Sequence, residues 1–155
     1  MNFQILAINS DQFSHLFGQD GAALMTQGIQ RRVVDSNPGY PCRVSLQDAE
    51  VGETVLLMNY EHQPMPTPFR SSHAIFVRES AKDVELKPNE VPEMFRHRLI
   101  SVRAFDASGM MIDADIVGGE QLESVIEEMF ANESADSLHL HNAKLGCYAA
   151  RVKRY

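Results

Sequence analysis

The sequence has no tryptophan and only two cysteines, Cys42 and Cys147, among its 155 residues. Two cysteines do not make the disulfide framework that stabilises small secreted domains, so we expect reduced thiols and a cytoplasmic protein. Long apolar runs are also missing. Residues 1–8 lack a basic segment and are too short to anchor the chain in a membrane or to cross one. These absences argue against a disulfide scaffold and against a membrane partner.

An excess of basic charge is absent as well, because 21 acidic residues outnumber 14 basic ones and give a formal net charge of −7. Nucleic acids bind net basic faces, so a nucleic-acid partner is disfavoured. Arginines nevertheless outnumber lysines ten to four. The rigid guanidinium fork suits fixed pairs with carboxylates or phosphates, although ordinary salt bridges to the acidic residues are the simpler interpretation.

The length and the apolar fraction of 44% fit a single domain over residues 1–155. No repeat, low-complexity segment or long linker divides the chain. Apolar patterning predicts one clear amphipathic helix at about 119–131, and a cap at Ser10-Asp11 begins one or two short N-terminal helices. Short strands are predicted at residues 3–8, 29–35, 54–60, 74–78, 99–105, 110–117, 138–142 and 147–153. This order indicates an α+β fold with a mainly antiparallel sheet.

The chemically richest segment is the loop at residues 37–49. Pro38 and Pro41 stiffen the backbone on both sides of Tyr40, and Cys42 and Arg43 follow. A guanidinium beside a thiol lowers the pKa of that thiol and makes it a better nucleophile. The alternative is a buried structural thiol with an arginine that fastens the loop.

Two histidines, His139 and His141, project from the same face of a predicted strand. That spacing suits two metal ligands, with Cys42, His62, His73 or Cys147 as candidates for a third. A structural role on a half-exposed sheet is the simpler interpretation, so no metal site is predicted and a site on these two histidines remains an alternative.

Two further motifs have plain structural interpretations. Gly118-Gly119 before the predicted helix resembles an anion-binding helix start, but the glycine-rich nucleotide fingerprints are absent and a tight turn explains the pair. The proline-rich residues 64–70 resemble a ligand of a proline-recognition module, whereas their place between two strands favours a stiff internal loop.

Several of these motifs together resemble a known family. Residues 38–49, followed by Gly52-Glu53 and Leu56-Leu57, resemble the signature of a bacterial family of uncharacterised proteins, domain of unknown function 1203. Further similar segments lie at residues 60–64, 67–70, 75–78, 103–106, 139–143 and 146–152. The resemblance implies a compact bacterial domain whose loops carry Cys, Arg, His and Tyr, and it implies no activity, substrate or catalytic residue.

The sequence therefore supports two functional hypotheses. The first is a domain that binds, or acts on, an anionic small molecule in a loop cleft. Cys42 is the candidate catalytic nucleophile there, and the candidate ligand-binding residues are Tyr40, Arg43, Arg70, Arg78, Arg103, His141 and Arg151. The second is a non-enzymatic interaction or structural domain in which an exposed face binds a partner or forms a homodimer. No catalytic or cofactor motif is present, so the sequence names no cofactor and does not decide whether the protein is an enzyme.

Overall fold

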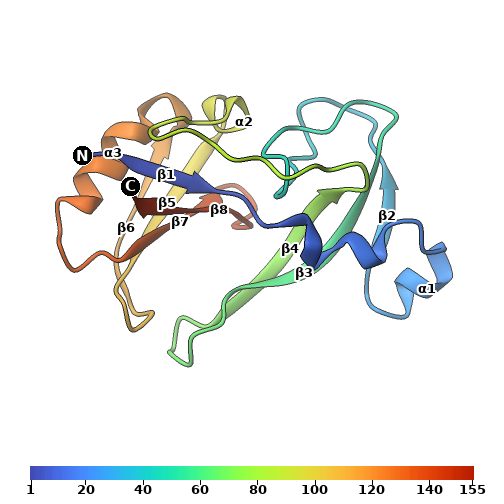
Figure 1. Cartoon of the computed structure of the whole chain (residues 1–155), viewed down its shortest axis with the longest axis horizontal. Coiled ribbons are helices and arrows are strands. Elements are labelled where there is room, and N and C mark those ends of the chain that lie inside the picture. The colour runs from blue at the N-terminus through green and yellow to red at the C-terminus, as the bar shows by residue number, and fades with distance from the viewer.

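Two antiparallel sheets lie side by side in the computed structural model, which describes all 155 residues (Figure 1). The larger sheet has the strand order β1-β8-β7-β5-β6 and the smaller one β2-β3-β4. The strands are β1 (Phe3–Leu6), β2 (Gln30–Val33), β3 (Thr54–Gln63), β4 (Ser71–Arg78), β5 (Leu99–Phe105), β6 (Met111–Gly118), β7 (Ser137–Asn142) and β8 (Tyr148–Arg154). The helices are α1 (Gly21–Met25), α2 (Glu93–Arg96) and α3 (Leu122–Phe130), with 3-10 turns η1 (Ser10–Gln12), η2 (Ser14–Leu16) and η3 (Gly119–Gln121). The fold class is α+β, as predicted, and none of the helices is long and apolar enough to span a membrane.

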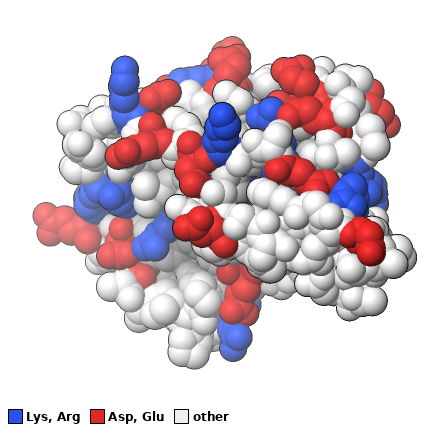
Figure 2. Space-filling view, turned by 45° about the vertical axis from the view of Figure 1, so that its right-hand side comes forward, with Lys and Arg blue, Asp and Glu red and all other residues white.

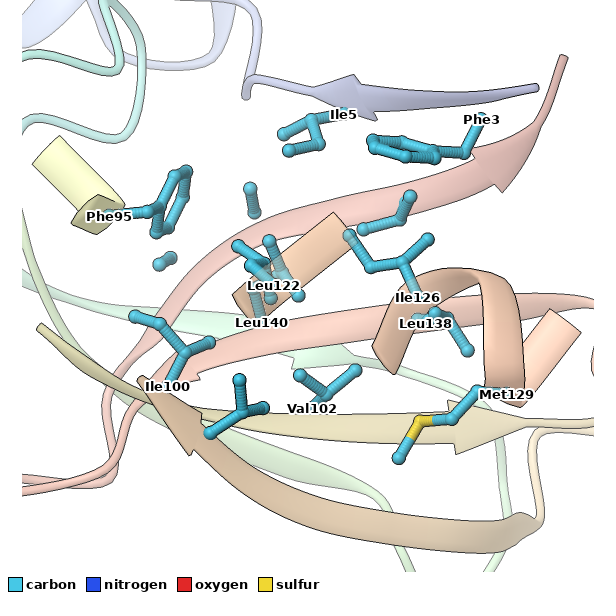
Figure 3. Close-up of a cluster of buried hydrophobic side chains, with 14 of the residues drawn as sticks. Phe3, Ile5, Phe95, Ile100, Val102, Leu122, Ile126, Met129, Leu138 and Leu140 are labelled. Atoms are coloured by element: carbon cyan, nitrogen blue, oxygen red, sulfur yellow. The ribbon is translucent and has the colours of Figure 1, made fainter. Parts of the chain in front are cut away.

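The larger sheet has one apolar and one polar face, because successive side chains of a strand point to opposite sides. On the apolar face, buried side chains from β1, β5, β7 and β8 meet the apolar stripe of α3 (Figure 3). On the polar face, Ser101 lies opposite His141 and Arg103 lies opposite His139 in the β5–β7 register. The polar face of the larger sheet therefore presents the serine, arginine and histidine side chains that could form a site.

The smaller sheet forms a second core with the N-terminal segment. Leu56 and Met58 of β3 and Ile75 and Val77 of β4 are buried with apolar side chains from η1 to α1. Tyr148, the first residue of β8, belongs to the same core although its strand is part of the larger sheet. The two sheets therefore meet around the start of β8.

The hairpin turns of the two sheets contact each other at one end. The β5–β6 turn contains Gly109, whose φ of 85° is in the left-handed region that favours glycine. The Thr67 hydroxyl in the β3–β4 connection donates to the carbonyl of Gly109 at 3.1 Å. The proline-rich segment is thus an internal loop between β3 and β4 that packs on the neighbouring turn.

One local prediction needs correction, and one glycine has a physical explanation. The N-terminal cap is Asn9, whose side chain accepts from the amide of Asp11, and the segment forms 3-10 turns in place of a regular helix. At the start of α3, a Cβ on Gly119 would lie 1.7 Å from the carbonyl oxygen of Phe95. Close approach to α2 therefore explains why a glycine occupies this position.

Candidate functional site

The loop at residues 37–49 lies against the smaller sheet and directs Arg43 into the interior. The amide of Arg43 donates to the carbonyl of Phe76 on β4 at 3.1 Å, and the amide of Ile8 donates to the carbonyl of Arg43 at 3.0 Å. The loop is thus held between β4 and the segment that follows β1.

Arg43 is a buried cation with no carboxylate partner. Only 1% of the residue is exposed. Its Nε donates to the carbonyl of Tyr148 at 2.7 Å, and its Nη1 donates to the carbonyl of Pro41. Burial lowers the pKa of the guanidinium, while interactions with Cys147 and Cys42 act in the opposite direction. Arginine keeps its charge in proteins, so the interior holds a positive charge that no acidic side chain neutralises.

Arg43 lies in the wall of a cleft of about 830 Å³, which we call the Arg43 cleft. Its apolar wall includes Leu57 of β3 and Phe76 of β4, and two strongly exposed leucines, Leu99 and Leu145, also line it. No acidic side chain lines the cleft. Its basic and thiol-bearing residues are Arg43, His73, His97, Arg98, Lys144 and Cys147.

The charge of Arg98 is already paired. Its Nη2 and Nη1 atoms donate to the two carboxylate oxygens of Asp48 at 2.6 and 2.8 Å. Burial by itself would raise the pKa of Asp48, but the hydrogen bonds and charge of Arg98 outweigh burial and lower it. Arg43 and Lys144 are therefore the arginine and lysine cations of the cleft without an ion-pair partner.

The other predicted ligand-binding residues lie outside the Arg43 cleft, so the structure does not gather them into one pocket. Arg70 pairs with Glu61 at 3.0 Å and Arg78 with Glu53 at 2.7 Å. The hydroxyl of Tyr40 donates to Asp35 at 2.8 Å. Each of these side chains donates a hydrogen bond to an acidic neighbour, as expected if most arginines form ordinary salt bridges.

Two more of these arginines, Arg103 and Arg151, lie on or near the polar face of the larger sheet. The Nε of Arg103 donates to the Ser101 hydroxyl at 3.2 Å. Arg151 forms a long ion pair of 3.5 Å with Asp136. Neither arginine reaches the Arg43 cleft.

The two cysteines differ in access. Cys42 has no exposed surface and belongs to the apolar core of the smaller sheet. Its Sγ accepts from the amides of Ser45 and Arg78 at 3.5 and 3.4 Å. The position of Cys42 gives no support to a nucleophilic role, because a substrate cannot reach the thiol in this conformation. Cys147, in contrast, lines the Arg43 cleft and accepts from the Asn142 side chain at 3.4 Å.

A second constellation, the histidine cluster, consists of His62 on β3 with His139 and His141 on β7. One ring nitrogen of each lies within 4.8 Å of the others. Burial is the main reason why the pKa of His62 falls to about 4 and the pKa values of His139 and His141 fall to about 3. The nearby charge of Arg103 lowers all three further. The three imidazoles are therefore neutral at neutral pH.

Most of the Arg43 cleft is not predictable from the sequence. Its lining comes from the 39–43 loop, from β3 and β4, and from residues 97–99 and 142–147. No sequence pattern links these segments. Arg43 and Cys147 are the two cleft residues that the sequence motifs singled out.

These features define an α+β protein whose two sheets meet at a buried, unpaired arginine. A family model described as "Protein of unknown function (DUF1203)" matches residues 39–154, so the chain belongs to this family. The match confirms the resemblance seen in the loop motif. No curated protein and no solved structure matches the chain.

Proposed function

We propose that the protein binds a small organic anion with an apolar portion in the Arg43 cleft. The observation that carries this proposal is the buried guanidinium of Arg43, which lines the cleft without a carboxylate partner. An unpaired buried charge is unfavourable, and an anionic ligand group would compensate it.

The surroundings of Arg43 support an anion rather than a cation. Lys144 adds a second unpaired positive charge, and acidic side chains are absent from the lining. Over the face seen in Figure 2, by contrast, acidic and basic side chains are intermixed. A carboxylate or a phosphate group in the cleft would be attracted by the positive charges of Arg43 and Lys144.

The walls and the size of the cleft support an apolar ligand body. Leu57, Phe76 and Leu145 offer apolar contact, and burial of apolar surface contributes about 25 cal/mol per Å². The volume of about 830 Å³ lies within the range typical of small-molecule sites. Cys147 is the nucleophilic residue in the lining of the cleft. No base is assigned to its thiol, so we propose binding and no reaction.

The test is thermal stability with four probes: octanoate, phenyl phosphate, inorganic phosphate and uncharged octanol. We expect octanoate or phenyl phosphate to raise the melting temperature, and octanol and inorganic phosphate to have much smaller effects. Amide NMR signals of Leu57, Phe76 and Leu145 should shift with the same probes. Equal effects of octanol and octanoate, or no effect of either organic anion, would contradict the proposal.

Variants at the mouth of the cleft test the location without disturbing the core. Lys144→Ala and Leu145→Asp should weaken binding, because one removes a positive charge and the other puts a negative charge beside the ligand. Lys153→Ala is the matched control, since Lys153 is exposed on β8 and does not line this cleft. A control that weakens binding as much as Lys144→Ala would place the ligand elsewhere.

A second candidate function is self-association through the same face, giving a homodimer. It is favoured by Leu99 and Leu145, which are 61% and 73% exposed beside the apolar wall. Light scattering coupled to size exclusion measures the mass directly. A dimer that Leu145→Asp converts to a monomer supports this function, and a monomer at all concentrations excludes it.

The cytoplasmic location and bacterial source expected from the sequence remain predictions. Both cysteines are free in the structure, which suits a reducing compartment. Cell fractionation of a producing bacterium would test the location, and recovery outside the cytoplasm would contradict it.

A further inference from the structure

Three imidazoles from two different sheets converge between the β3 strand and the polar face of the larger sheet. His62 comes from β3, and His139 and His141 come from β7. The ring centroid of His62 lies 5.7 Å from that of His139 and 4.8 Å from that of His141. His141 is fully buried and His139 is 5% exposed. Polar rings at such depth normally have hydrogen-bond partners.

The hydrogen bonds of His141 define its tautomer. Its Nδ1 lies 2.9 Å from the carbonyl oxygen of Gly146. A carbonyl only accepts, so Nδ1 carries the proton and Nε2 has a free lone pair. That Nε2 atom is buried and has no hydrogen-bond partner. A histidine whose second nitrogen donates to a backbone carbonyl is the arrangement commonly found for metal ligands.

The other two histidines also have an unsatisfied nitrogen. Nδ1 of His62 and Nδ1 of His139 are buried without a partner. An unsatisfied buried polar group destabilises the folded protein, so three in one cluster need an explanation. A cation that accepts lone pairs from all three rings satisfies them together.

We propose that His62, His139 and His141 bind one divalent transition-metal ion of the zinc type. Neutral imidazole nitrogens suit Zn²⁺, Co²⁺, Ni²⁺ and Cu²⁺, whereas Mg²⁺ and Ca²⁺ prefer oxygen ligands. Tetrahedral bonds of about 2.0–2.1 Å place ligand nitrogens about 3.4 Å apart. The nitrogens of the cluster lie within 4.8 Å of one another, so the rings would have to move closer together on binding the ion.

A pocket of about 340 Å³ gives the ion a path of entry. His62 and His139 line it, together with the Tyr148 ring that stacks on His62 at 5.2 Å. Three protein ligands leave the fourth position of a tetrahedral ion open for water or another small ligand. Arg103 and Arg151 add positive charge near the cluster, which opposes a bare cation and favours an anionic fourth ligand such as hydroxide.

The test uses tag-free full-length protein, treated with a chelator and then titrated with Co²⁺ or Zn²⁺. We expect one ion per chain by elemental analysis after removal of free metal. Bound Co²⁺ should show the intense visible absorption of tetrahedral coordination. Zn²⁺ should raise the melting temperature, because a ligand that binds only the folded state stabilises it. Substoichiometric uptake of Co²⁺ and Zn²⁺ would overturn the proposal.

Substitutions locate the ion. His62→Ala should weaken binding by more than the roughly 10- to 100-fold that loss of an outer hydrogen-bond partner costs in metal sites. His62 is the gentlest change, because it is less buried than the other two histidines. His15→Ala is the matched control, since His15 is exposed and outside the cluster. Unchanged Co²⁺ binding by His62→Ala, in protein whose circular dichroism matches the wild type, would also overturn the proposal.

His139→Gln and His141→Gln complete the set. If either variant fails to fold, His62→Ala still decides the question, because its fold is checked independently. The readout is metal content and absorption, so the result does not depend on the anion-binding proposal for the Arg43 cleft. The lining residues of the two pockets do not overlap.

Discussion

The Nε atom of Arg43 donates to the main-chain oxygen of Tyr148 at 2.7 Å, across 105 positions of sequence. The ring of Tyr148 stacks on His62 with centroids 5.2 Å apart. One residue at the start of β8 therefore contacts both Arg43, through its main chain, and the histidine cluster, through its side chain.

Arg43→Met should destabilise the protein by about 2–4 kcal/mol, because the carbonyls of Tyr148 and Pro41 lose their buried donor. Removal of a desolvated charge offsets part of that cost. Urea unfolding measures the difference. Arg32→Met, on an exposed position of β2, should change stability by less than about 0.5 kcal/mol. Equal effects of the two variants would show that the buried hydrogen bonds contribute little.

Gly119→Ala should destabilise by at least about 1–3 kcal/mol, because the added Cβ would meet the Phe95 carbonyl oxygen at 1.7 Å. The control is Gly21→Ala at the first position of α1, where no atom lies within 4 Å of the new Cβ. That substitution should be neutral or stabilise by up to about 1 kcal/mol. Thermal unfolding of both variants checks the prediction, and a neutral Gly119→Ala would contradict it.

The metal-free protein should lose stability as the pH falls from about 6.5 toward 5. The unfolded chain takes up protons on its histidines near pH 6.5, whereas His139 and His141 stay neutral in the folded state until about pH 3. Protonation thus favours the unfolded chain, by up to about 1.4 kcal/mol per pH unit for each of these two. His62 has a pKa of about 4 and is partly exposed, so it contributes less to this loss of stability.

The measurement for this pH dependence is urea unfolding at pH 7, 6 and 5 in the presence of a chelator. Replacing His139 by Gln should reduce the slope by about one proton per molecule in this interval. His15→Ala serves again as the control, because His15 is exposed. A slope that His139→Gln leaves unchanged would show that this histidine is not held neutral in the folded protein.

Thiol labelling should distinguish the two cysteines. Cys147 lines the Arg43 cleft and is 6% exposed, whereas Cys42 has no exposed surface. Iodoacetamide should therefore modify Cys147 first in the folded protein, and mass spectrometry of the digested protein identifies the site. An anion bound in the cleft should protect Cys147. Faster labelling of Cys42 would restore it as a reactive residue.

The expectation of a single domain gives a further prediction, that both sheets unfold in one transition. Tyr148 of β8 is part of the apolar core of the smaller sheet, so the two cores share a strand. Far-ultraviolet circular dichroism reports the strands and near-ultraviolet dichroism reports the tyrosines. The two melting curves should coincide, and separate midpoints would indicate two units.

The elements of the fold were predictable where the sequence is periodic. The hairpin of β5 and β6 and the stripe of α3 repeat at the spacing of strand and helix, so their positions follow from local pattern. The N-terminal segment lacks such a run. There the cap at Ser10-Asp11 predicted a helix, whereas the backbone forms 3-10 turns, and Phe13 and Leu16 are buried against the smaller sheet.

The candidate sites were less predictable, because they depend on contacts between distant segments. His139 and His141 were recognisable as one strand face, but the choice of His62 among four candidate third ligands depends on how β3 crosses β7. The loop motif pointed to Arg43. It did not reveal that Arg70 pairs with Glu61 and Arg78 with Glu53, because ion pairs between separate segments have no signature in sequence.

The outermost pairing of the larger sheet joins the two ends of the described chain, since Phe3 of β1 lies opposite Arg154 of β8, and both termini lie at this edge in Figure 1. During synthesis, β1 leaves the ribosome long before its partner strand β8 has been made. The smaller sheet, formed within residues 30–78, closes over a much shorter stretch of chain. Assembly during synthesis would therefore begin with β2, β3 and β4, and β1 would wait, with its edge unpaired, for the last strand to be made.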